Sequence, residues 1–416
     1  MQIFKFGGAS VKNAEGVKNL ASVLQQVGYT NTLVVVSAMG KTTNALELVI
    51  KNYFDNKAEL QSSIQEVKKY HNEILLDLFE NTQHAIFKKV ASFFEDLDHF
   101  LRRNKSPDYN FVYDQVIGYG ELTSTTIISA YLNDIGIKNN WLDVREFIKT
   151  DDYYRRANVN WEQTQTNIKE CFDTKILNIT QGFLGSNSNN FTTTLGREGS
   201  DYTAAIFGYC LNAESVTIWK DVPGILNADP RYFENAQLLH SISYREAIEL
   251  AFYGASVIHP KTLQPLQQKE IPLFVKSFLN PKNEGTMVGK GVGLDPDIPC
   301  FIVKKNQVLI SLSSLDFSYI VEENISQIFK LLHLYKMKVD VIQNSAISFS
   351  VCFENSYSNL ERLLQHLKAK FKVTCYENVN LYTIRHYNEQ AVSSLETGKE
   401  LLLKQLTQET IQIVTK

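Results

Sequence analysis

The sequence contains no run of about 18 consecutive apolar residues, so we expect no membrane-spanning helix. Its five cysteines are widely spaced and none form a C-x-x-C pair, which favours buried, reduced thiols over a disulfide framework. Net charge is only −3, with both signs interspersed, so composition predicts neither nucleic-acid nor membrane-surface binding. The first residues, MQIFKFGGAS, fit a strand rather than a signal peptide, and we therefore expect a cytoplasmic protein.

The 416 residues are enough for two or three domains, and the 44% hydrophobic content is that of a globular protein. The patterning predicts a strand at 2–6, then a helix capped by Ser10. A β-branched run at 32–38 predicts a strand buried on both faces, followed by a helix from Asn44. This alternation favours a mostly parallel α/β sheet.

The segments after residue 44 also predict helices and strands. Residues 45–110 predict a lobe of amphipathic helices, to which we assign no chemistry. Further elements are expected as strands at 176–182, 215–219 and 272–277 and as helices at 200–212 and 243–253.

A glycine- and proline-rich segment at 283–299 predicts a domain boundary, and we expect domains at 1–290 and 300–416. The second domain has the element order β-α-β-β-α-β followed by β-α-β, which indicates one ferredoxin-like unit and part of another. Strand 300–305 is a candidate to complete the second unit. Open sheet edges in such units favour pairing between chains, so we expect a homodimer.

Several expected strands lead into loops rich in glycine and hydroxyl residues, where backbone N–H groups can hold an anion. In the first, KFGGAS, Gly7 and Gly8 follow Lys5, although a tight turn beside a snorkelling lysine is an equal alternative. The second, SAMGKTTN, does not fit a phosphate-binding P-loop, because Val35 stands where that motif needs glycine.

Three more segments carry charge. GYGELTST places Glu121 at what reads as the start of a helix. TLGREGSDYTAA places Arg197 and Asp201 around another helix start, where a surface ion pair and a dipole partner are the plain alternatives. WKDVPGILNADPR is expected to form a rigid, non-helical loop because it contains two prolines and a glycine. Asp221 and Arg231 are its candidate polar contacts to a ligand.

These motifs, together with GASVIHPKTL, occur in an order that resembles the amino acid kinase family and, within it, aspartate kinases. The C-terminal region resembles the ACT regulatory domains of those enzymes. The resemblance covers nearly the whole chain and implies a three-layer αβα kinase fold followed by α+β ferredoxin-like domains. It implies phosphoryl transfer from ATP, with Mg²⁺, to the β-carboxylate of L-aspartate, the first step of lysine, threonine and methionine biosynthesis.

The resemblance also implies residue roles. The catalytic group is Lys5, Gly7, Gly8 and Asp201; the substrate-binding group is Thr43, Glu121, Arg197 and Asp201; the nucleotide-binding group is Lys5, Gly8, Ser10, Ser200, Lys220, Asp221, Arg231 and Lys261. No protein ligand set for a metal is expected, because Mg²⁺ would be held largely by phosphates and water.

Three departures from the family pattern stand out. Glu198 occupies a position where relatives often have glycine. Ser256 occupies the place of a nucleotide-contacting lysine, for which Lys261 or Lys276 is the candidate substitute. The stretch 320–324 contains two acids where relatives bind a feedback amino acid, which disfavours a carboxylate there. The resemblance implies lysine or threonine as the feedback amino acid at the ACT region, but the two acids disfavour feedback inhibition through this site.

Two alternatives remain. One is another family member acting on glutamate or N-acetylglutamate, although an acetylated amine has no need of Glu121 and Asp201 beside it. The other is a catalytically idle amino-acid sensor, against which Lys5 and Arg197 argue.

Overall fold

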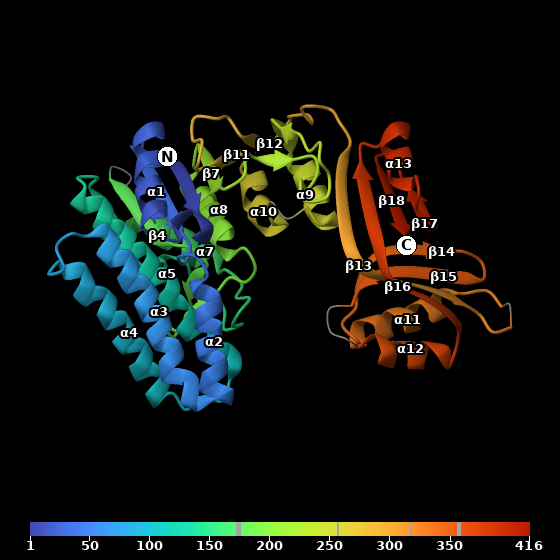
Figure 1. Cartoon of the computed structure of the whole chain (residues 1–416), viewed down its shortest axis with the longest axis horizontal. Coiled ribbons are helices and arrows are strands. Elements are labelled where there is room, and N and C mark those ends of the chain that lie inside the picture. Colours follow the sequence, from blue (N-terminus) through green and yellow to red (C-terminus); the bar gives the residue numbers. More distant parts are fainter. Residues whose placement is uncertain (172–175, 256–257, 317, 356–358) are drawn as a thin grey trace. The chain divides into compact units, whose positions relative to one another are not determined.

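The computed structural model describes residues 1–171, 176–255, 258–316, 318–355 and 359–416 (Figure 1). It divides into two compact units. Unit 1 comprises Met1–Ile225, Leu238–Ile248 and Ile258–Leu294, and unit 2 comprises Leu226–Gln237, Glu249–Val257 and Asp295–Lys416. Two short segments of the expected 1–290 domain are thus grouped with the C-terminal region.

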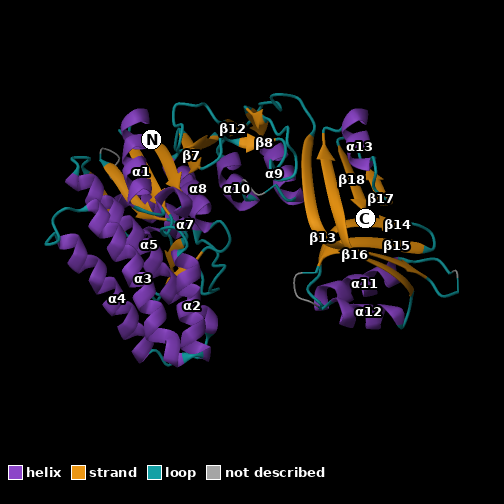
Figure 2. Cartoon of the chain, viewed as in Figure 1, coloured by secondary structure: helices purple, strands orange, loops and turns teal. Residues whose placement is uncertain are grey.

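Unit 1 combines strands with helices, including four consecutive helices between residues 42 and 134, and unit 2 is richer in strands (Figure 2). The helices are the 3₁₀ turn Gly8–Val11, α1 Ala14–Val27, α2 Thr42–Asp55, α3 Lys57–Leu78, α4 Ala85–Arg103, α5 Tyr109–Asp134, α6 Val144–Phe147, α7 Trp161–Cys171, α8 Gly199–Leu211, α9 Tyr244–Tyr253, α10 Pro260–Gln268, α11 Glu322–Leu334, α12 Leu360–Lys368 and α13 Glu389–Glu396. The strands are β1 Gln2–Phe6, β2 Thr32–Val36, β3 Asn139–Leu142, β4 Leu177–Gln181, β5 Leu184–Ser186, β6 Thr192–Thr194, β7 Ser215–Lys220, β8 Ile225–Leu226, β9 Leu238–Leu239, β10 Ser241–Ser243, β11 Leu273–Ser277, β12 Thr286–Gly289, β13 Cys300–Ser313, β14 Lys338–Asn344, β15 Ser348–Glu354, β16 Lys372–Arg385, β17 Leu401–Leu406 and β18 Thr410–Thr415.

Unit 1 is built on an eight-stranded sheet with the order β10-β12-β11-β7-β1-β2-β4-β3. Its pairings are parallel except that between β11 and β12. Successive strand residues face opposite sides of a sheet. Phe4 and Phe6 of β1 enter the core shared with α1 and α5, so Lys5 faces the other side, on which α8 packs against β1. The mostly parallel αβα arrangement is confirmed.

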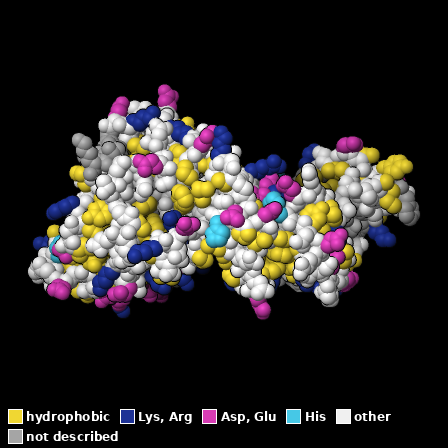
Figure 3. Space-filling view, turned by 90° about the horizontal axis from the view of Figure 1, so that it is seen from above, with side chains coloured by type: hydrophobic (Ala, Val, Ile, Leu, Met, Phe, Trp, Pro, Cys, Tyr) yellow, Lys and Arg dark blue, Asp and Glu magenta, His cyan; other side chains and the backbone are white. Residues whose placement is uncertain are grey.

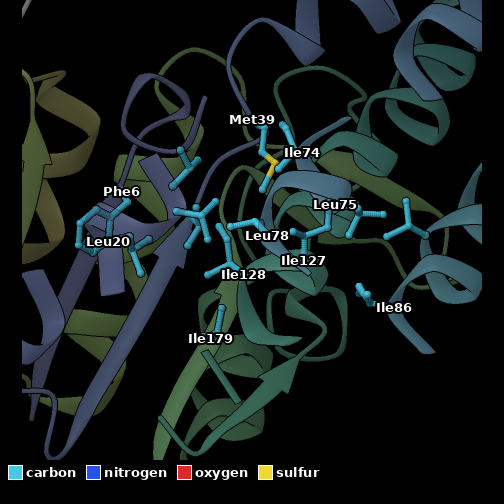
Figure 4. Packing of buried hydrophobic residues seen from close by; sticks show 14 of the residues in the cluster. Phe6, Leu20, Met39, Ile74, Leu75, Leu78, Ile86, Ile127, Ile128 and Ile179 are labelled. Atoms are coloured by element: carbon cyan, nitrogen blue, oxygen red, sulfur yellow. The ribbon is translucent and has the colours of Figure 1, made fainter. Parts of the chain in front are cut away.

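The helical lobe is continuous with the core of the sheet. Buried side chains from β1, β4, the loop after β2 and the helices α1, α3, α4 and α5 form one cluster. Figure 4 shows these side chains close together between the strands and the helices; it labels Phe6, Leu20, Met39, Ile74, Leu75, Leu78, Ile86, Ile127, Ile128 and Ile179. The lobe therefore folds as part of unit 1, as the amphipathic pattern predicted.

Two local expectations for unit 1 were wrong. The helix after β1 is capped by the Asn13 side chain, which accepts a hydrogen bond from the Gly16 N–H, whereas Ser10 lies in the preceding 3₁₀ turn. Glu121 lies in the middle of α5 rather than at a helix start. Its neighbouring glycines did not mark a turn: a Cβ on Gly120 would lie only 3.1 Å from the Ala38 side chain, so close packing explains that glycine.

Unit 2 contains a single six-stranded sheet with the order β14-β15-β13-β16-β18-β17. The elements from β13 to β16 follow the predicted β-α-β-β-α-β order. Both β13 and β16 are long enough to run through both halves of the sheet, and residues 300–304 pair with 381–385. The expected strand 300–305 therefore joins the second half, alongside α13, β17 and β18.

Burial and charge agree with the composition. The side chains of four cysteines are described, all as thiols rather than disulfides, and burial raises the pKa of Cys210 and Cys352 to about 12. None of the described helices is long and apolar enough to cross a bilayer. Lysine and arginine are interspersed with acidic side chains over the face seen in Figure 3.

Candidate active site

The carboxyl ends of four neighbouring parallel strands, β7, β1, β2 and β4, meet at one edge of the sheet in unit 1. The predicted loops after β1, β2 and β7 therefore lie side by side. Backbone hydrogen bonds join the first two: the Ser37 N–H donates to Phe6 O at 3.1 Å, and the Gly40 N–H donates to Gly8 O at 3.0 Å. This edge is where open α/β sheets bind ligands.

The glycines of the first loop allow the chain to pass very close to its neighbours. A Cβ on Gly8 would lie 2.6 Å from the Ala38 carbonyl oxygen, which is backbone and cannot move aside. A Cβ on Gly7 would lie 3.2 Å from the Nζ of Lys5. Gly7 thus keeps the space beside the lysine ammonium open, and Gly8 lets the loops after β1 and β2 pack closely together.

A buried charge cluster lies beside these glycines. Lys5 Nζ is 2.7 Å from Asp201 Oδ1, and Lys220 Nζ is 3.9 Å from Asp201 Oδ2. The Lys5 and Asp201 side chains are only 10% and 4% exposed. β1, β7 and the first turn of α8 supply the three groups, so residues far apart in the sequence of unit 1 meet here. Two ammonium groups thus lie within 3.9 Å of one buried carboxylate, beside the glycine loop.

Glu121 has a strongly perturbed carboxyl group. Burial raises its pKa to about 8, although hydrogen bonds from backbone groups including Ala38 lower it in part. Its Oε2 atom is buried and has no hydrogen-bond partner. A buried carboxylate with a free oxygen is costly unless a cation arrives to pair with it. This arrangement suits an ammonium-bearing substrate.

The remaining substrate candidates lie at two helix starts. Thr43 is the second residue of α2 and is half-buried, while Arg197 precedes α8 and is exposed. Glu198 is the N-cap residue of α8 and has φ 52°, in the left-handed region that favours glycine. Its Oε2 is buried without a partner. No further contact assigns a role to Glu198.

The nucleotide candidates are divided between the units. Ser10 and Ser200 are buried in unit 1, and Asp221 is exposed just after β7. Arg231 lies in unit 2, where its guanidinium pairs with Asp229 at 2.5 Å. Arg231 therefore belongs to a different unit from the other nucleotide candidates.

Neither substitute for the expected lysine is free of other contacts. The Lys261 ammonium lies 4.6 Å from the ring centroid of Tyr202, and burial lowers the pKa of Lys261. The Lys276 ammonium lies 5.4 Å from the ring centroid of Phe274. Ser256, at the expected lysine position, lies outside the described residues.

A model of the amino acid kinase family matches residues 1–277, most of the chain. The chain belongs to the amino acid kinase family. Among curated relatives, it is 29% identical to the lysine-sensitive aspartokinase 3 of Escherichia coli over 406 residues, covering 92% of this chain and 86% of that one. It is 31% identical to the chloroplastic aspartokinase 1 of Arabidopsis thaliana over 382 residues, covering 87% of this chain and 65% of the relative. It spans 42% of a bifunctional aspartokinase/homoserine dehydrogenase from Daucus carota.

Solved structures of the family agree with the fold of this member. E. coli aspartokinase III in complex with lysine and aspartate superposes with a TM-score of 0.83 at 27% identity, covering 100% of this chain and 95% of that one. The structure of the same enzyme with aspartate and ADP superposes with a TM-score of 0.80 at 26% identity, covering 100% of this chain and 96% of that one. The aspartate kinase of Clostridium acetobutylicum superposes with a TM-score of 0.83 at 21% identity, which supports the fold alone.

In this family member the helical lobe also touches the loops of the site, which the sequence did not suggest. His71 of α3 has its Nε2 3.4 Å from Thr42 Oγ1 and its Nδ1 2.8 Å from Val67 O. Burial lowers the pKa of His71 to about 4. Tyr70 donates a hydrogen bond to Lys12 O. α3 thus holds the start of α2, and no motif in α3 signals this.

A second missed residue is Asp114 of α5. Its carboxylate accepts hydrogen bonds from the Arg155 N–H and from both the N–H and the hydroxyl of Thr194. Burial raises its pKa to about 6. Asp114 therefore ties α5 to β6, the strand that leads into the Arg197 loop. An isolated aspartate in a helical pattern gave no sign of this contact.

Proposed function

We propose that the chain is an ATP-dependent aspartate kinase, which transfers the γ-phosphoryl group to the β-carboxylate of L-aspartate and forms 4-phospho-L-aspartate. The observation that carries the proposal is the buried cluster of Lys5, Asp201 and Lys220 beside the glycine loop. The E. coli relative whose structure was solved with aspartate and ADP aligns over the whole chain, which supports the same substrates here.

The reaction needs no general base from the protein. The β-carboxylate of aspartate is ionised at neutral pH, since its ordinary pKa is about 3.9. Catalysis then depends on positioning and on neutralising charge as the phosphoryl group moves. Lys5 carries that charge stabilisation, with the N–H groups of Gly7 and Gly8 beside it. Asp201 holds the Lys5 ammonium in place.

Aspartate has three charged groups, and the site offers partners for those at its α-carbon. We assign the α-carboxylate to Arg197, whose planar guanidinium matches a carboxylate. We assign the α-ammonium to Glu121 and Asp201. Thr43, near the start of α2, orients the side chain. Glu121 gains the most from this assignment, because a nearby ammonium favours the ionised form of its buried carboxyl group.

The nucleotide side of the site is assigned to Ser10, Ser200, Lys220, Asp221 and Lys261, which all lie in unit 1. Arg231 is left out of this assignment because it lies in unit 2. Over the described residues, no three His, Cys, Asp or Glu side chains gather as a metal site. A Mg²⁺ ion that accompanies ATP would be held largely by phosphate oxygens and water. The ion would neutralise phosphate charge during transfer.

The test is formation of ADP, or trapping of the acyl phosphate with hydroxylamine, when folded protein receives ATP, Mg²⁺ and L-aspartate. Glutamate and N-acetylglutamate serve as comparison substrates. Absence of aspartate-dependent turnover would contradict the proposal, and turnover with N-acetylglutamate alone would favour the other family members.

Lys5→Ala separates an enzyme from an idle sensor. We expect kcat to fall by about 10² or more, as for loss of an oxyanion donor, while aspartate binding changes little. Lys18→Ala is the control, because Lys18 is exposed on α1 and pairs with the nearby Glu15. Equal activity of wild type and Lys5→Ala, with folding verified by circular dichroism, would remove Lys5 from the reaction.

Feedback control by lysine or threonine at the ACT region is disfavoured by the residues at the start of α11. The E. coli relative was solved with lysine bound. In this chain Glu322 and Glu323 lie in the first turn of α11. The side chain of Asn324 already accepts a hydrogen bond from the Val321 N–H. An effector carboxylate at that helix start would lie near two acidic side chains, and the Val321 N–H would not be available to donate a hydrogen bond to it. Activity measured with lysine, threonine and methionine added singly decides whether any of them inhibits.

A further inference from the structure

Unit 2 contains a cavity of about 570 Å³ lined by residues of which only Arg231 is a predicted nucleotide-binding residue. One side is lined by residues 227–235, between β8 and β9. The other lining residues come from β13, from β16, and from the end of α13 with Lys399 just after it. Phe301, Val303 and Lys305 alternate along β13 and all line the cavity, as expected for residues on one face of a strand.

Residues 227–235 are held against the start of β13 by specific contacts. The Phe301 N–H donates to Asn227 O at 2.7 Å, and Asn227 Nδ2 donates to Pro299 O at 2.9 Å. The centroids of the Phe233 and Phe301 rings lie 5.3 Å apart. Within the loop between β8 and β9, the Gln237 N–H donates to Asn227 Oδ1 at 2.7 Å. The cavity is therefore built by tertiary contacts between segments distant in sequence.

Two ammonium groups of the cavity are held by aromatic rings. Lys305 Nζ lies 4.1 Å from the ring centroid of Tyr232, and Lys399 Nζ lies 4.1 Å from that of Tyr382. A ring positions a cation without neutralising it. Among the ion pairs of the described chain, neither lysine has a carboxylate partner within 4.0 Å. Both therefore keep their full charge for a ligand.

The charge balance of the lining is positive. Arg231 also lines the cavity but shares its charge with Asp229, whose carboxylate it grips through two nitrogens. Glu234 is the one acidic residue among the lining side chains, against Arg231, Lys305 and Lys399. A volume of this size holds a small metabolite rather than a macromolecule.

We propose that this cavity is a binding site for a small multivalent anion, a phosphate- or polycarboxylate-bearing metabolite, whose charged groups are held by Lys305 and Lys399. The site lies entirely in unit 2 and does not depend on the proposed kinase activity. Each lysine would donate a charge-assisted hydrogen bond to the ligand.

The test is lysine footprinting of the full-length protein with an acetylating reagent, read by mass spectrometry. Pyrophosphate and citrate are the two probes, and sodium chloride at the same ionic strength is the reference. We expect at least one probe to slow acetylation of Lys305 and Lys399 about fivefold or more, as for a site that is mostly occupied, with Lys330 on α11 unaffected. Protection by pyrophosphate alone identifies a phosphate ligand, and protection by citrate alone a polycarboxylate.

Substitution gives the second arm. The double variant Lys305→Gln, Lys399→Gln should bind the protecting anion about tenfold or more weakly, since each charged hydrogen bond contributes at least that factor. Lys330→Gln should bind it as wild type does. Equal acetylation with probe and with chloride overturns the proposal, and so does unchanged affinity in the double variant. Because neither readout measures kinase activity, a failure here stays distinct from a failure of the proposed function.

Discussion

Individual side chains of the site lie in surroundings that disfavour their charged forms and that a bound substrate would make more favourable. Glu121 shows this most clearly. Its carboxyl pKa is raised from 4.5 to about 8 by burial, and one oxygen has no partner. Functional sites often keep such costs because binding relieves them.

We predict that Glu121→Gln stabilises the unliganded protein and impairs aspartate binding. A raised pKa means that the contribution of the acid to stability is complete below pH 4.5 and is lost as pH rises through about 8. The glutamine carries no charge, so its advantage in melting temperature should grow from pH 5 to pH 9, reaching about 2 °C or more. The aspartate KM should rise about tenfold or more through loss of the charged partner.

Differential scanning calorimetry at several pH values and steady-state kinetics make the two measurements. Asp98→Asn is a control, because Asp98 is a partly exposed carboxylate of α4 paired with Arg102. A Glu121→Gln protein that melts lower than wild type at pH 9 would refute the assigned cause.

Arg197 is the complementary case, an exposed cation with no ion pair among those found in the described chain. We predict that Arg197→Ala raises the aspartate KM by about 10-fold to 100-fold, the range for loss of a charged hydrogen bond, with little change in stability. Arg103→Ala, at the exposed end of α4, is the control in the same steady-state assay. If the aspartate KM stays unchanged, Arg197 does not contact the substrate.

Among the helices, strands and loops, the sheet and most loops of the site followed from sequence. Continuous β-branched strands alternating with amphipathic helices predicted the parallel sheet, and the glycines after β1 marked its ligand edge. The position of Glu121 did not follow, because GYGE reads equally as a turn or as close helix packing. The Lys5–Asp201 pair joins residues far apart in sequence, so only the family resemblance suggested it. The contacts of His71 and Asp114 depend on tertiary packing that no local pattern encodes.

Gly120 provides a test of how α5 positions α2. A Cβ there would lie 3.1 Å from the Ala38 side chain, 3.2 Å from that of Thr42 and 3.3 Å from that of Leu46. Alanine improves helix propensity by about 1 kcal/mol, but it should push away the helix start that carries Thr43. We predict a folded Gly120→Ala protein with an aspartate KM raised about threefold or more, an effect of about 0.6 kcal/mol or more.

Gly118→Ala is the matched control on the same helix. The nearest atoms to its Cβ would belong to the Thr192 and Leu184 side chains, at 3.2 Å and 3.5 Å, and neither residue is in α2. An equal rise in KM for both variants would show that α5 as a whole, rather than its contact with α2, sets the effect.

Unit 2 presents apolar side chains that its own fold leaves uncovered, which bears on the assembly of the whole molecule. Leu315, Tyr319 and Leu334 are 68%, 73% and 66% exposed, and all three lie in α11 or shortly before it. The sheet of unit 2 also ends in open edges at β14 and β17. Exposed apolar side chains and unpaired edges are both typical of surfaces that bind a second chain.

We therefore predict a homodimer held through unit 2. Light scattering after size exclusion should give twice the chain mass of 47.4 kDa. The double variant Tyr319→Glu, Leu334→Glu should shift the protein to the single-chain mass, because burying two carboxylates at an interface costs several kcal/mol. Leu76→Glu, which places the same charge on an exposed leucine of α3 in unit 1, should leave the dimer intact. A wild-type protein that stays at 47.4 kDa at micromolar concentration would contradict the dimer, and dissociation by Leu76→Glu alone would move the interface to unit 1.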